Sequence, residues 1–282
     1  MNIRKNRNKQ NGYSLAEKSG FAAFLLAVPL GFIAPSLAAL PLLLFLLTCL
    51  AAPFCPQCSF FLPVISNGRP ESDAIALTID DGPSPSSTPL LLALLGKHRL
   101  RATFFVIGEK AAAYPELIDL ILGHGHTIGN HSYRHDNFLM CRSIRALEKD
   151  IRATQDILAQ AGIQPLLFRP PIGITNPRLK PVLDGLGLQA VTFSCRIFDR
   201  SNRNVANLAA KVLRKLRPGD ILLLHDNPPP NSEKIAYWHT ELDYLFSNLQ
   251  ELHHVVPLSE LIGRPVMIAI EKPQTDALAP NT

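Results

Sequence analysis

The sequence predicts an α/β fold: a distorted (β/α) barrel of about seven parallel strands, preceded by an N-terminal membrane anchor. Two observations carry this prediction. Strand-like and helix-like segments alternate from residue 70 onward, and a long apolar run without charged residues precedes them. Six or seven βα units over about 195 residues favour a barrel-like parallel sheet over a small open sheet.

The apolar run covers residues 21–67, and no charged residue interrupts it. A membrane-spanning helix needs about 20 apolar residues, so the run is long enough for two. A break at Ala34-Pro35-Ser36 predicts a turn between Phe21–Ile33 and Leu37–Leu62. We therefore expect residues 21–66 to form a two-helix hairpin in the membrane lipid. A single tilted anchor and a long signal peptide are the alternatives, and a signal peptide has a shorter apolar core with a small-residue cleavage site.

The net charge of +5 is concentrated in the basic tail, residues 1–20. Five basic residues against Glu17 give 5 − 1 = +4 there, which leaves +1 for the rest of the chain. A nearly neutral body argues against a nucleic-acid partner, which would require a basic face.

Basic residues that flank a membrane span normally stay in the cytoplasm, so a hairpin would return the domain to the cytoplasmic face of the inner membrane. A single span would place the domain on the periplasmic or extracellular side.

After residue 70, short apolar runs typical of buried strands alternate with longer runs of helical spacing. The predicted strands are Ala74–Ile79, Ala102–Ile107, Leu166–Phe168, Gln189–Phe193 and Ile221–Leu224, with Val255–Pro257 as a candidate closing strand. The predicted helices are Thr88–His98, Pro115–Leu122, Ser143–Gln160, Pro177–Leu186, Val205–Leu216 and Ile235–Leu252. We assign residues 72–265 to one folded domain and residues 271–282 to a flexible tail.

Two adjacent carboxylates, Asp80 and Asp81, follow the first predicted strand directly and precede a Gly-Pro turn. Acidic side chains at the carboxyl end of a barrel strand are typical of a catalytic metal site. If one carboxylate binds a divalent ion, the other can accept a proton from water bound to that ion. The alternative is a solvated Asp-Gly-Pro surface turn.

A pair of histidines, His131 and His135, lies four residues apart. On one helical turn this spacing directs both imidazoles to the same point, as a metal site requires. One Asp with two His leaves coordination positions open for water and substrate. A lone histidine is more often a packed or exposed bystander, and His124 and His126 are only weak candidates for further contact with the metal.

Three more polar residues follow predicted strands. Arg169 is followed by Pro170-Pro171, so a rigid turn can hold its guanidinium against a carboxylate in a bidentate contact. His225 ends a very apolar strand, where an imidazole can donate a proton to a leaving group. Asp199 lies after another strand and could set the protonation of His225. Each residue also has a purely structural interpretation: Arg169 as a helix cap, His225 as a turn residue and Asp199 as a solvated carboxylate. Because polar residues recur at successive strand ends, we favour the interpretation that they form a single functional site.

The five cysteines indicate no disulfide framework. Cys55-x-x-Cys58 is a possible redox or zinc pair, but zinc takes four ligands and no second pair exists. We interpret the cysteines as packing thiols.

Over residues 72–265 the chain resembles the polysaccharide deacetylase family, carbohydrate esterases that include chitooligosaccharide and peptidoglycan N-deacetylases. The resemblance is carried by Thr78-Ile79-Asp80-Asp81-Gly82-Pro83, His131-Ser132-Tyr133-Arg134-His135, Arg169-Pro170-Pro171-Ile172-Gly173 and Leu222-Leu223-Leu224-His225-Asp226. A fourth motif of the family, commonly Asp-x-x-Asp-Trp, departs here to Arg196-Ile197-Phe198-Asp199-Arg200.

The resemblance implies a role for each matching residue. Asp81, His131 and His135 would bind a divalent metal, with zinc as the expected ion. Asp80 would be the general base and Arg169 would orient it. His225 would be the general acid, tuned by Asp199, and the backbone N–H of Ile172 would stabilise the oxyanion.

The expected activity is therefore removal of an N-acyl group from an amino sugar of a cell-envelope glycan or a lipid-linked saccharide. Arg196, Arg200 and the anchor favour a phosphate-bearing, lipid-linked substrate, such as an undecaprenyl-phosphate derivative that loses an acetyl or formyl group. A non-catalytic sugar-binding or scaffold protein is one alternative. A metal-dependent amidohydrolase or esterase of small molecules is another.

Overall fold

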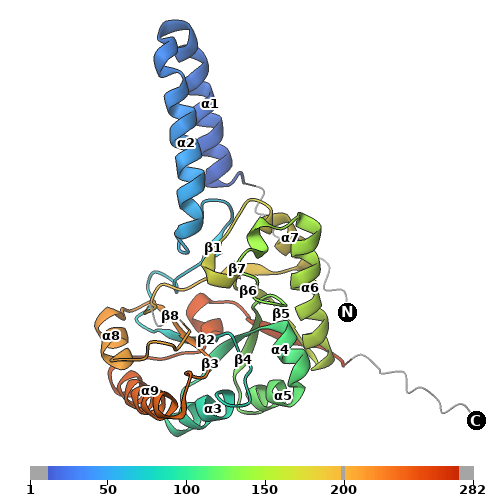
Figure 1. Ribbon diagram of the computed structural model, residues 1–282, viewed down its shortest axis with the longest axis vertical. Coiled ribbons are helices and arrows are strands. Elements are labelled where there is room, and N and C mark those ends of the chain that lie inside the picture. Colours follow the sequence, from blue (N-terminus) through green and yellow to red (C-terminus); the bar gives the residue numbers. More distant parts are fainter. Residues whose placement is uncertain (1–11, 198–200, 273–282) are drawn as a thin grey trace, which may run out of the picture.

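A helical hairpin precedes the folded domain in the computed structural model, which describes residues 12–197 and 201–272 (Figure 1). Helix α1 (Leu15–Ile33) begins with a capping box, in which Ser14 and Glu17 satisfy each other's backbone N–H groups. A 3₁₀ turn, Pro35–Leu37, stands at the predicted break, and α2 (Ala39–Ala51) runs back toward the domain. A further 3₁₀ turn, Ala52–Phe54, ends the hairpin.

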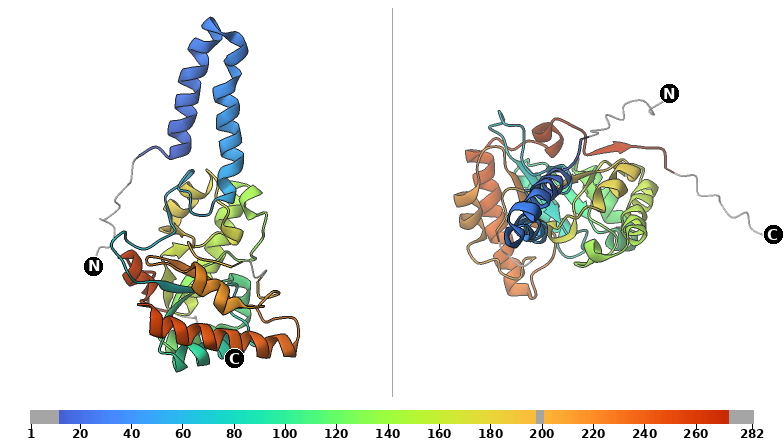
Figure 2. Two further views of the ribbon diagram at one scale, coloured as in Figure 1. Left: turned by 90° about the vertical axis from the view of Figure 1, so that its left-hand side faces the viewer. Right: turned by 90° about the horizontal axis from the view of Figure 1, so that it is seen from above.

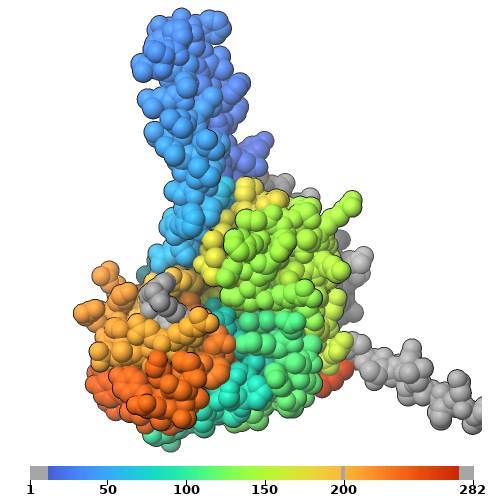
Figure 3. Space-filling view, viewed as in Figure 1, coloured from blue at the N-terminus to red at the C-terminus, as the bar shows by residue number. Residues whose placement is uncertain are grey.

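Both arms of the hairpin, Leu15–Ile33 and Pro35–Phe54, are long and apolar enough to cross a membrane. A signal sequence near the N-terminus passes the same test. The hairpin stands clear of the domain surface, and most of its large apolar side chains are exposed (Figure 3). Only its base packs against the domain, where the backbone N–H of Ala16 donates to the carbonyl of Phe60 and Ala16 joins a core cluster with Phe60 and Phe61.

The domain is built around a seven-stranded parallel sheet in the order β1-β7-β6-β4-β3-β2-β8. Its strands are β1 (Val64–Ile65), β2 (Ala76–Asp80), β3 (Ala102–Val106), β4 (Thr127–Asn130), β6 (Leu167–Phe168), β7 (Gln189–Val191) and β8 (Ile221–His225). The chain after β7 forms a parallel bridge between Cys195 and Leu222, which joins the two sides of the curled sheet. The prediction of a distorted barrel of about seven parallel strands is confirmed.

Helices cover the outside of this barrel (Figure 2). They are α3 (Thr88–Lys97), α4 (Gly108–Ala113), α5 (Pro115–Gly123), α6 (Ile144–Gln160), α7 (Leu179–Leu186), α8 (Leu208–Lys215), α9 (Ser232–Leu252) and α10 (Leu258–Ile262). The main core lies between the sheet and the helices, and α9 contributes Trp238 and Phe246, both fully buried. The strands β2 and β3 are buried along their whole length, as continuous apolar runs in a parallel sheet require.

One prediction about the sheet was wrong, and two of its strands were not predicted. Strand β1 lies within residues 21–66, which were assigned to the membrane hairpin, and the second arm ends at Phe54 instead of Leu62. Val255–Pro257 is not a strand, because only Val255 forms an isolated bridge to Ile75 before Pro257 leads into α10. Strand β4 was not predicted, since Thr127-Ile128-Gly129-Asn130 contains a single large apolar residue. A separate antiparallel pair, β5 (Ile163–Pro165) with β9 (Met267–Ala269), lies outside the barrel sheet.

The interpretation of all five cysteines as packing thiols was also wrong. Cys55 and Cys58 form a disulfide in the segment between the hairpin and β1. Cys49, Cys141 and Cys195 are free thiols. A pair three residues apart closes only a small loop, so it needs no framework of further cysteines.

His126, one of the two weak metal candidates, lies away from the carboxyl ends of the strands. Its Nδ1 accepts a hydrogen bond from the backbone N–H of Ala102, at the first residue of β3. Burial, with the positive charge of Arg101, lowers the pKa of His126 to about 4, so the ring is neutral near pH 7. A neutral imidazole that accepts a backbone hydrogen bond is a structural residue.

Candidate active site

The candidate site is built at one edge of the sheet, where the parallel strands β2, β4 and β8 end. Asp80 is the last residue of β2 and is paired in register with His225, the last residue of β8. The backbone N–H of Asp226 donates to the carbonyl of Asp80 at 2.7 Å, which holds the two strand ends together. The parallel topology therefore brings side chains far apart in the sequence into one cluster.

Asp81 leaves the strand in a left-handed conformation, with φ 71°. The next residue, Gly82, has to be glycine, because a Cβ there would overlap the buried carboxylate of Asp226. Ser87 and Thr88, at the start of α3, donate to this carboxylate. Burial nevertheless raises the pKa of Asp226 to about 6. Asp226 thus anchors the turn that directs the Asp81 side chain toward the histidines.

His131 and His135 lie on a loop after β4, not on the helical turn that their spacing suggested. Ser132 and His135 both adopt left-handed conformations, with φ 68° and 52°, and this irregular path brings the two imidazole rings to a centroid distance of 4.8 Å. Asn130 accepts from the N–H of Ser132, and Asp150 of α6 accepts from the N–H of Tyr133. These contacts fix the loop to the sheet and to α6.

The three side chains of Asp81, His131 and His135 form a cluster whose candidate ligand atoms all lie within 4.8 Å of one another. Oδ1 of Asp81 lies 3.4 Å from Nε2 of His131 and 3.3 Å from Nε2 of His135. Its other oxygen, Oδ2, accepts from Ser201 and Asn227. Burial opposes the ionised form, yet the hydrogen bond and charge of His131 lower the pKa of Asp81 far below its usual range.

The chemistry of this donor set fits a divalent cation. Nδ1 of His131 lies 2.8 Å from the carbonyl oxygen of Arg169, which can only accept, so Nδ1 carries the proton. The hydrogen bond to Asp81 requires a proton on Nε2 as well; when that proton is absent, the lone pair of Nε2 faces the Asp81 carboxylate inside a buried site and the two groups repel each other. A cation between them would turn this repulsion into coordination, and the outer hydrogen bond to Nδ1 would orient the ligand.

Asp80 lies beside this cluster and is held by Arg169. The guanidinium donates to the carboxylate through one nitrogen only, whereas a bidentate contact was predicted. Nη1 of Arg169 donates to Oδ1 of Asp80 at 2.6 Å and to Thr78, while Nη2 donates to the carbonyl of Thr192. The guanidinium is completely buried and lies 4.0 Å from the ring centroid of Phe105. Oδ2 of Asp80 faces Nε2 of His131 at 3.7 Å.

The remaining predicted residues surround the cluster or fall outside the described residues. His225 is half-buried, and its carbonyl accepts from Asn202. Ile172 lies in a left-handed conformation with φ 52°, and its backbone N–H has no acceptor within the described part of the chain. Asp199 and Arg200 lie outside the described residues.

Sequence reasoning missed two residues that support Asp81. Nζ of Lys110 donates to the carbonyl of Asp81 at 2.7 Å and to the side chain of Asn227 at 3.0 Å. Lys110 follows the end of β3 by a few residues, and Asn227 follows His225 by two. Their positions just after strand ends were the available signal, since the other site residues share it.

A polar cluster at the strand ends of a parallel barrel is the arrangement typical of a barrel enzyme, and comparison with known proteins gives the family. The polysaccharide deacetylase family model matches residues 67–191. Over 209 residues the chain is 32% identical to a chitooligosaccharide deacetylase of Bradyrhizobium sp. (strain ANU 289), covering 72% of this chain and 94% of the relative. It is 37% identical over 164 residues to a peptidoglycan-N-acetylglucosamine deacetylase of Bacillus cereus, covering 57% and 76% of the two chains.

Solved structures agree. A peptidoglycan N-acetylglucosamine deacetylase in complex with a hydroxamate-type benzamide superposes with a TM-score of 0.64 at 28% identity, covering 72% of this chain and 94% of the other. A mutant CE4 family pseudoenzyme with restored enzymatic activity gives a TM-score of 0.62 at 27% identity, covering 71% of each chain. The chain belongs to the polysaccharide deacetylase family, whose members are hydrolases that act on carbon–nitrogen amide bonds.

Proposed function

We propose that this protein is a membrane-anchored, metal-dependent hydrolase that removes an acetyl or formyl group from the nitrogen of an amino sugar. The substrate is a cell-envelope glycan or a lipid-linked saccharide. The observation that carries the proposal is the cluster of Asp81, His131 and His135 beside the buried carboxylate of Asp80. Relatives named as chitooligosaccharide and peptidoglycan deacetylases support the choice of reaction.

Asp81, His131 and His135 would hold the metal, with zinc as the expected ion. The chemistry that such an ion supplies when bound is polarisation of the acyl carbonyl and a lowered pKa for a coordinated water. The donor set supports this assignment, because two imidazole nitrogens and one carboxylate oxygen are typical ligands of catalytic zinc and leave further positions open.

Asp80 is the proposed general base. It takes a proton from the attacking water while the oxygen of that water bonds to the acyl carbon. Arg169 is a positioning residue that fixes the orientation of Asp80 through the contact of Nη1 with Oδ1. His225 protonates the sugar nitrogen as the carbon–nitrogen bond breaks, so that the products are a carboxylate and a free amine. Asp199 would tune His225, and the N–H of Ile172 would donate to the developing oxyanion.

The direct test is metal content together with deacylation, measured on the full-length protein in detergent. We expect about one equivalent of divalent metal and cleavage of N-acetylated or N-formylated amino sugars by the wild type. His131→Gln should lose the metal and the activity, whereas His239→Gln, on the outer helix α9, should retain both. A wild type that binds no metal and cleaves no N-acyl sugar would favour the sugar-binding alternative. Preference for O-acyl esters would favour the esterase alternative.

The hairpin also bears on which face of the membrane the domain occupies. Because both of its arms would cross the membrane, the N-terminal tail and the domain lie on the same face, and the basic tail favours the cytoplasmic face. The Cys55–Cys58 disulfide argues for the opposite face, because disulfides persist in oxidising compartments. We expect a C-terminal reporter that is active only outside the cytoplasm to be inactive. An active reporter would place the domain outside and the disulfide with it.

A further inference from the structure

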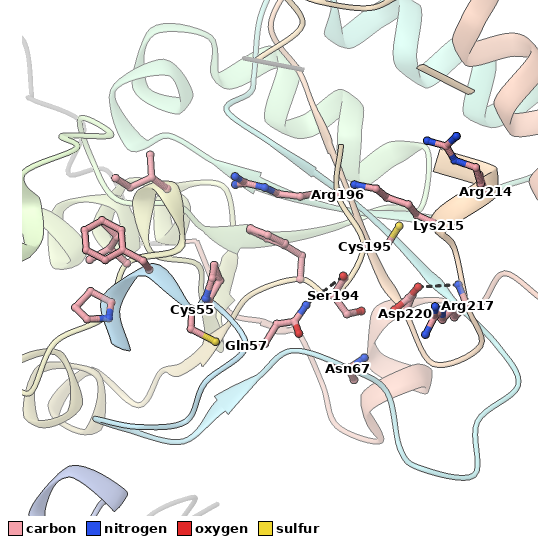
Figure 4. A pocket seen from close by; sticks show the side chains of 16 residues that line it. Cys55, Gln57, Asn67, Ser194, Cys195, Arg196, Arg214, Lys215, Arg217 and Asp220 are labelled. Atoms are coloured by element: carbon pink, nitrogen blue, oxygen red, sulfur yellow. Dashed lines mark hydrogen bonds between the residues drawn. The ribbon is translucent and has the colours of Figure 1, made fainter. Parts of the chain in front are cut away.

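A pocket of about 890 Å³, drawn in Figure 4, is lined by the segment that follows the hairpin and by residues of the domain, among them Ile172 of the candidate active site. We call it the basal pocket. Its lining comes from four separate stretches of the chain, which lie within residues 53–67, 172–174, 193–196 and 214–220. Such a position places any occupant between the membrane and the strand ends.

One side of the basal pocket is cationic. Four basic side chains, Arg196, Arg214, Lys215 and Arg217, line it, and Asp220 is the only acidic residue among the lining residues. The Asp220 carboxylate already accepts a hydrogen bond from the backbone N–H of Arg217 at 2.7 Å. Within the described residues none of the four cations forms an ion pair with a carboxylate. The pocket therefore presents a net positive charge that suits an anionic group with several acceptor oxygens.

The other part of the lining is apolar, and it includes the segment around Cys55 in Figure 4, which directly follows the hairpin in the chain. Phe54, at the end of the 3₁₀ turn that follows α2, is 79% exposed, and Ile172 is 47% exposed. The α2 surface beyond Phe54 is made of exposed leucines. An occupant that satisfies both sides is amphiphilic: its hydrocarbon chain would follow the hairpin and its anionic head would face the basic residues.

The basal pocket is joined rigidly to the candidate active site. Oγ1 of Thr192 donates to the carbonyl of Pro56 at 2.8 Å, and Gln57 donates to the carbonyl of Ser194 at 3.2 Å. The ring centroid of Phe193 lies 5.2 Å from the guanidinium of Arg196 and 5.9 Å from that of Arg169. One aromatic ring thus separates a pocket cation from the arginine that holds Asp80.

We propose that the basal pocket binds the phosphate of a lipid-linked amino sugar, in which the sugar is joined through phosphate to a long hydrocarbon chain. This inference rests on the proposed function and selects one of its two substrate classes. The phosphate sits against Arg196 and Lys215, the chain lies along α2, and the attached sugar extends past Ile172 toward Asp80. An uncharged glycan makes no use of the cationic side.

Binding of a long-chain polyprenyl phosphate to the full-length protein in detergent micelles tests this inference without catalysis. We expect the double variant Arg196→Gln/Lys215→Gln to bind at least about 100-fold more weakly, because each of the two lost charge-assisted hydrogen bonds weakens binding by roughly tenfold or more. The exposed Arg145 on α6 provides the matched control, and Arg145→Gln should bind as the wild type does. The dephosphorylated polyprenol should bind about as weakly as the double variant binds the phosphate.

Several results would overturn the inference. Equal affinity for polyprenol and polyprenyl phosphate would remove the role of the phosphate, and equal affinity for phosphatidylglycerol would make the pocket a general anionic-lipid site. Inorganic phosphate that binds as tightly would indicate a free-anion site, and an unchanged double variant would exclude these two cations. A protein that binds polyprenyl phosphate but cleaves no N-acyl sugar would contradict only the proposed function. Cleavage of soluble chitooligosaccharides without lipid-phosphate binding would contradict only the inference drawn from the pocket.

Discussion

Asp80→Asn is expected to lower kcat for deacylation by about 10³-fold, within the range usual for loss of a general base. The amide keeps the size of the side chain, and its oxygen can still accept from Arg169, so the local packing is preserved. What is lost is the capacity to take a proton. Bound metal should stay near one equivalent, because Asp81, His131 and His135 are the proposed ligands. Steady-state kinetics and metal analysis on the same preparation give both quantities.

The matched control for this variant is Asp184→Asn, an exposed aspartate on α7 that pairs with Lys180. It should leave kcat and metal content unchanged. Loss of metal in Asp80→Asn would make Asp80 part of the metal site and not the base. Activity within tenfold of the wild type would require another group to accept the proton.

Much of the barrel could be predicted from the sequence, because β2, β3 and β8 are apolar runs bounded by turn-forming residues. The strand β4 could not, since its burial depends on neighbours in the sheet and its sequence contains Gly129 and Asn130. Gly129 fits there because a Cβ would collide with the ring of Phe105 on the adjacent strand. That constraint comes from packing between strands and leaves no periodic signal in the sequence.

Residue chemistry was a better guide to the site than local geometry was. Carboxylates and imidazoles that follow strand ends were correctly expected to meet, whereas the helical path from His131 to His135 was wrong. Two left-handed residues make the loop, and no hydrophobic periodicity reports on them. The single contact between Arg169 and Asp80 has a similar origin, because Thr78 and the carbonyl of Thr192 take the other donors.

The basal pocket could not have been predicted from the sequence at all. Its cations and its apolar residues are supplied by four stretches that lie between Pro53 and Asp220, and only the closed barrel brings them together. In the sequence, Arg196 and Arg200 favoured a phosphate-bearing substrate, and Arg200 lies outside the described residues. The sequence gives no such signal for Arg214, Lys215 and Arg217, because basic residues in and after the last turn of a helix are usually solvated.

Arg169→Leu is expected to destabilise the fold by about 3 to 5 kcal/mol, the usual cost of removing one partner from a buried ion pair. The guanidinium is fully buried, and its removal leaves the Asp80 carboxylate without its cation in a site that is 3% exposed. Thr78 and the carbonyl of Thr192 lose a donor as well. Deacylation should fall as well, because Asp80 would lose the contact that fixes its orientation.

Chemical denaturation in detergent, followed by the fluorescence of the single tryptophan, measures this loss, since Trp238 is buried in the main core. Arg145→Leu, at an exposed position on α6, is the control for the loss of a surface arginine and should change stability by less than about 0.5 kcal/mol. The double variant Arg169→Leu/Asp80→Asn separates charge from packing. Because no carboxylate is then left unpaired, it should be more stable than Arg169→Leu alone. If the double variant is instead less stable than Arg169→Leu by the full cost of Asp80→Asn, the two residues are energetically independent and Arg169 does not act through Asp80.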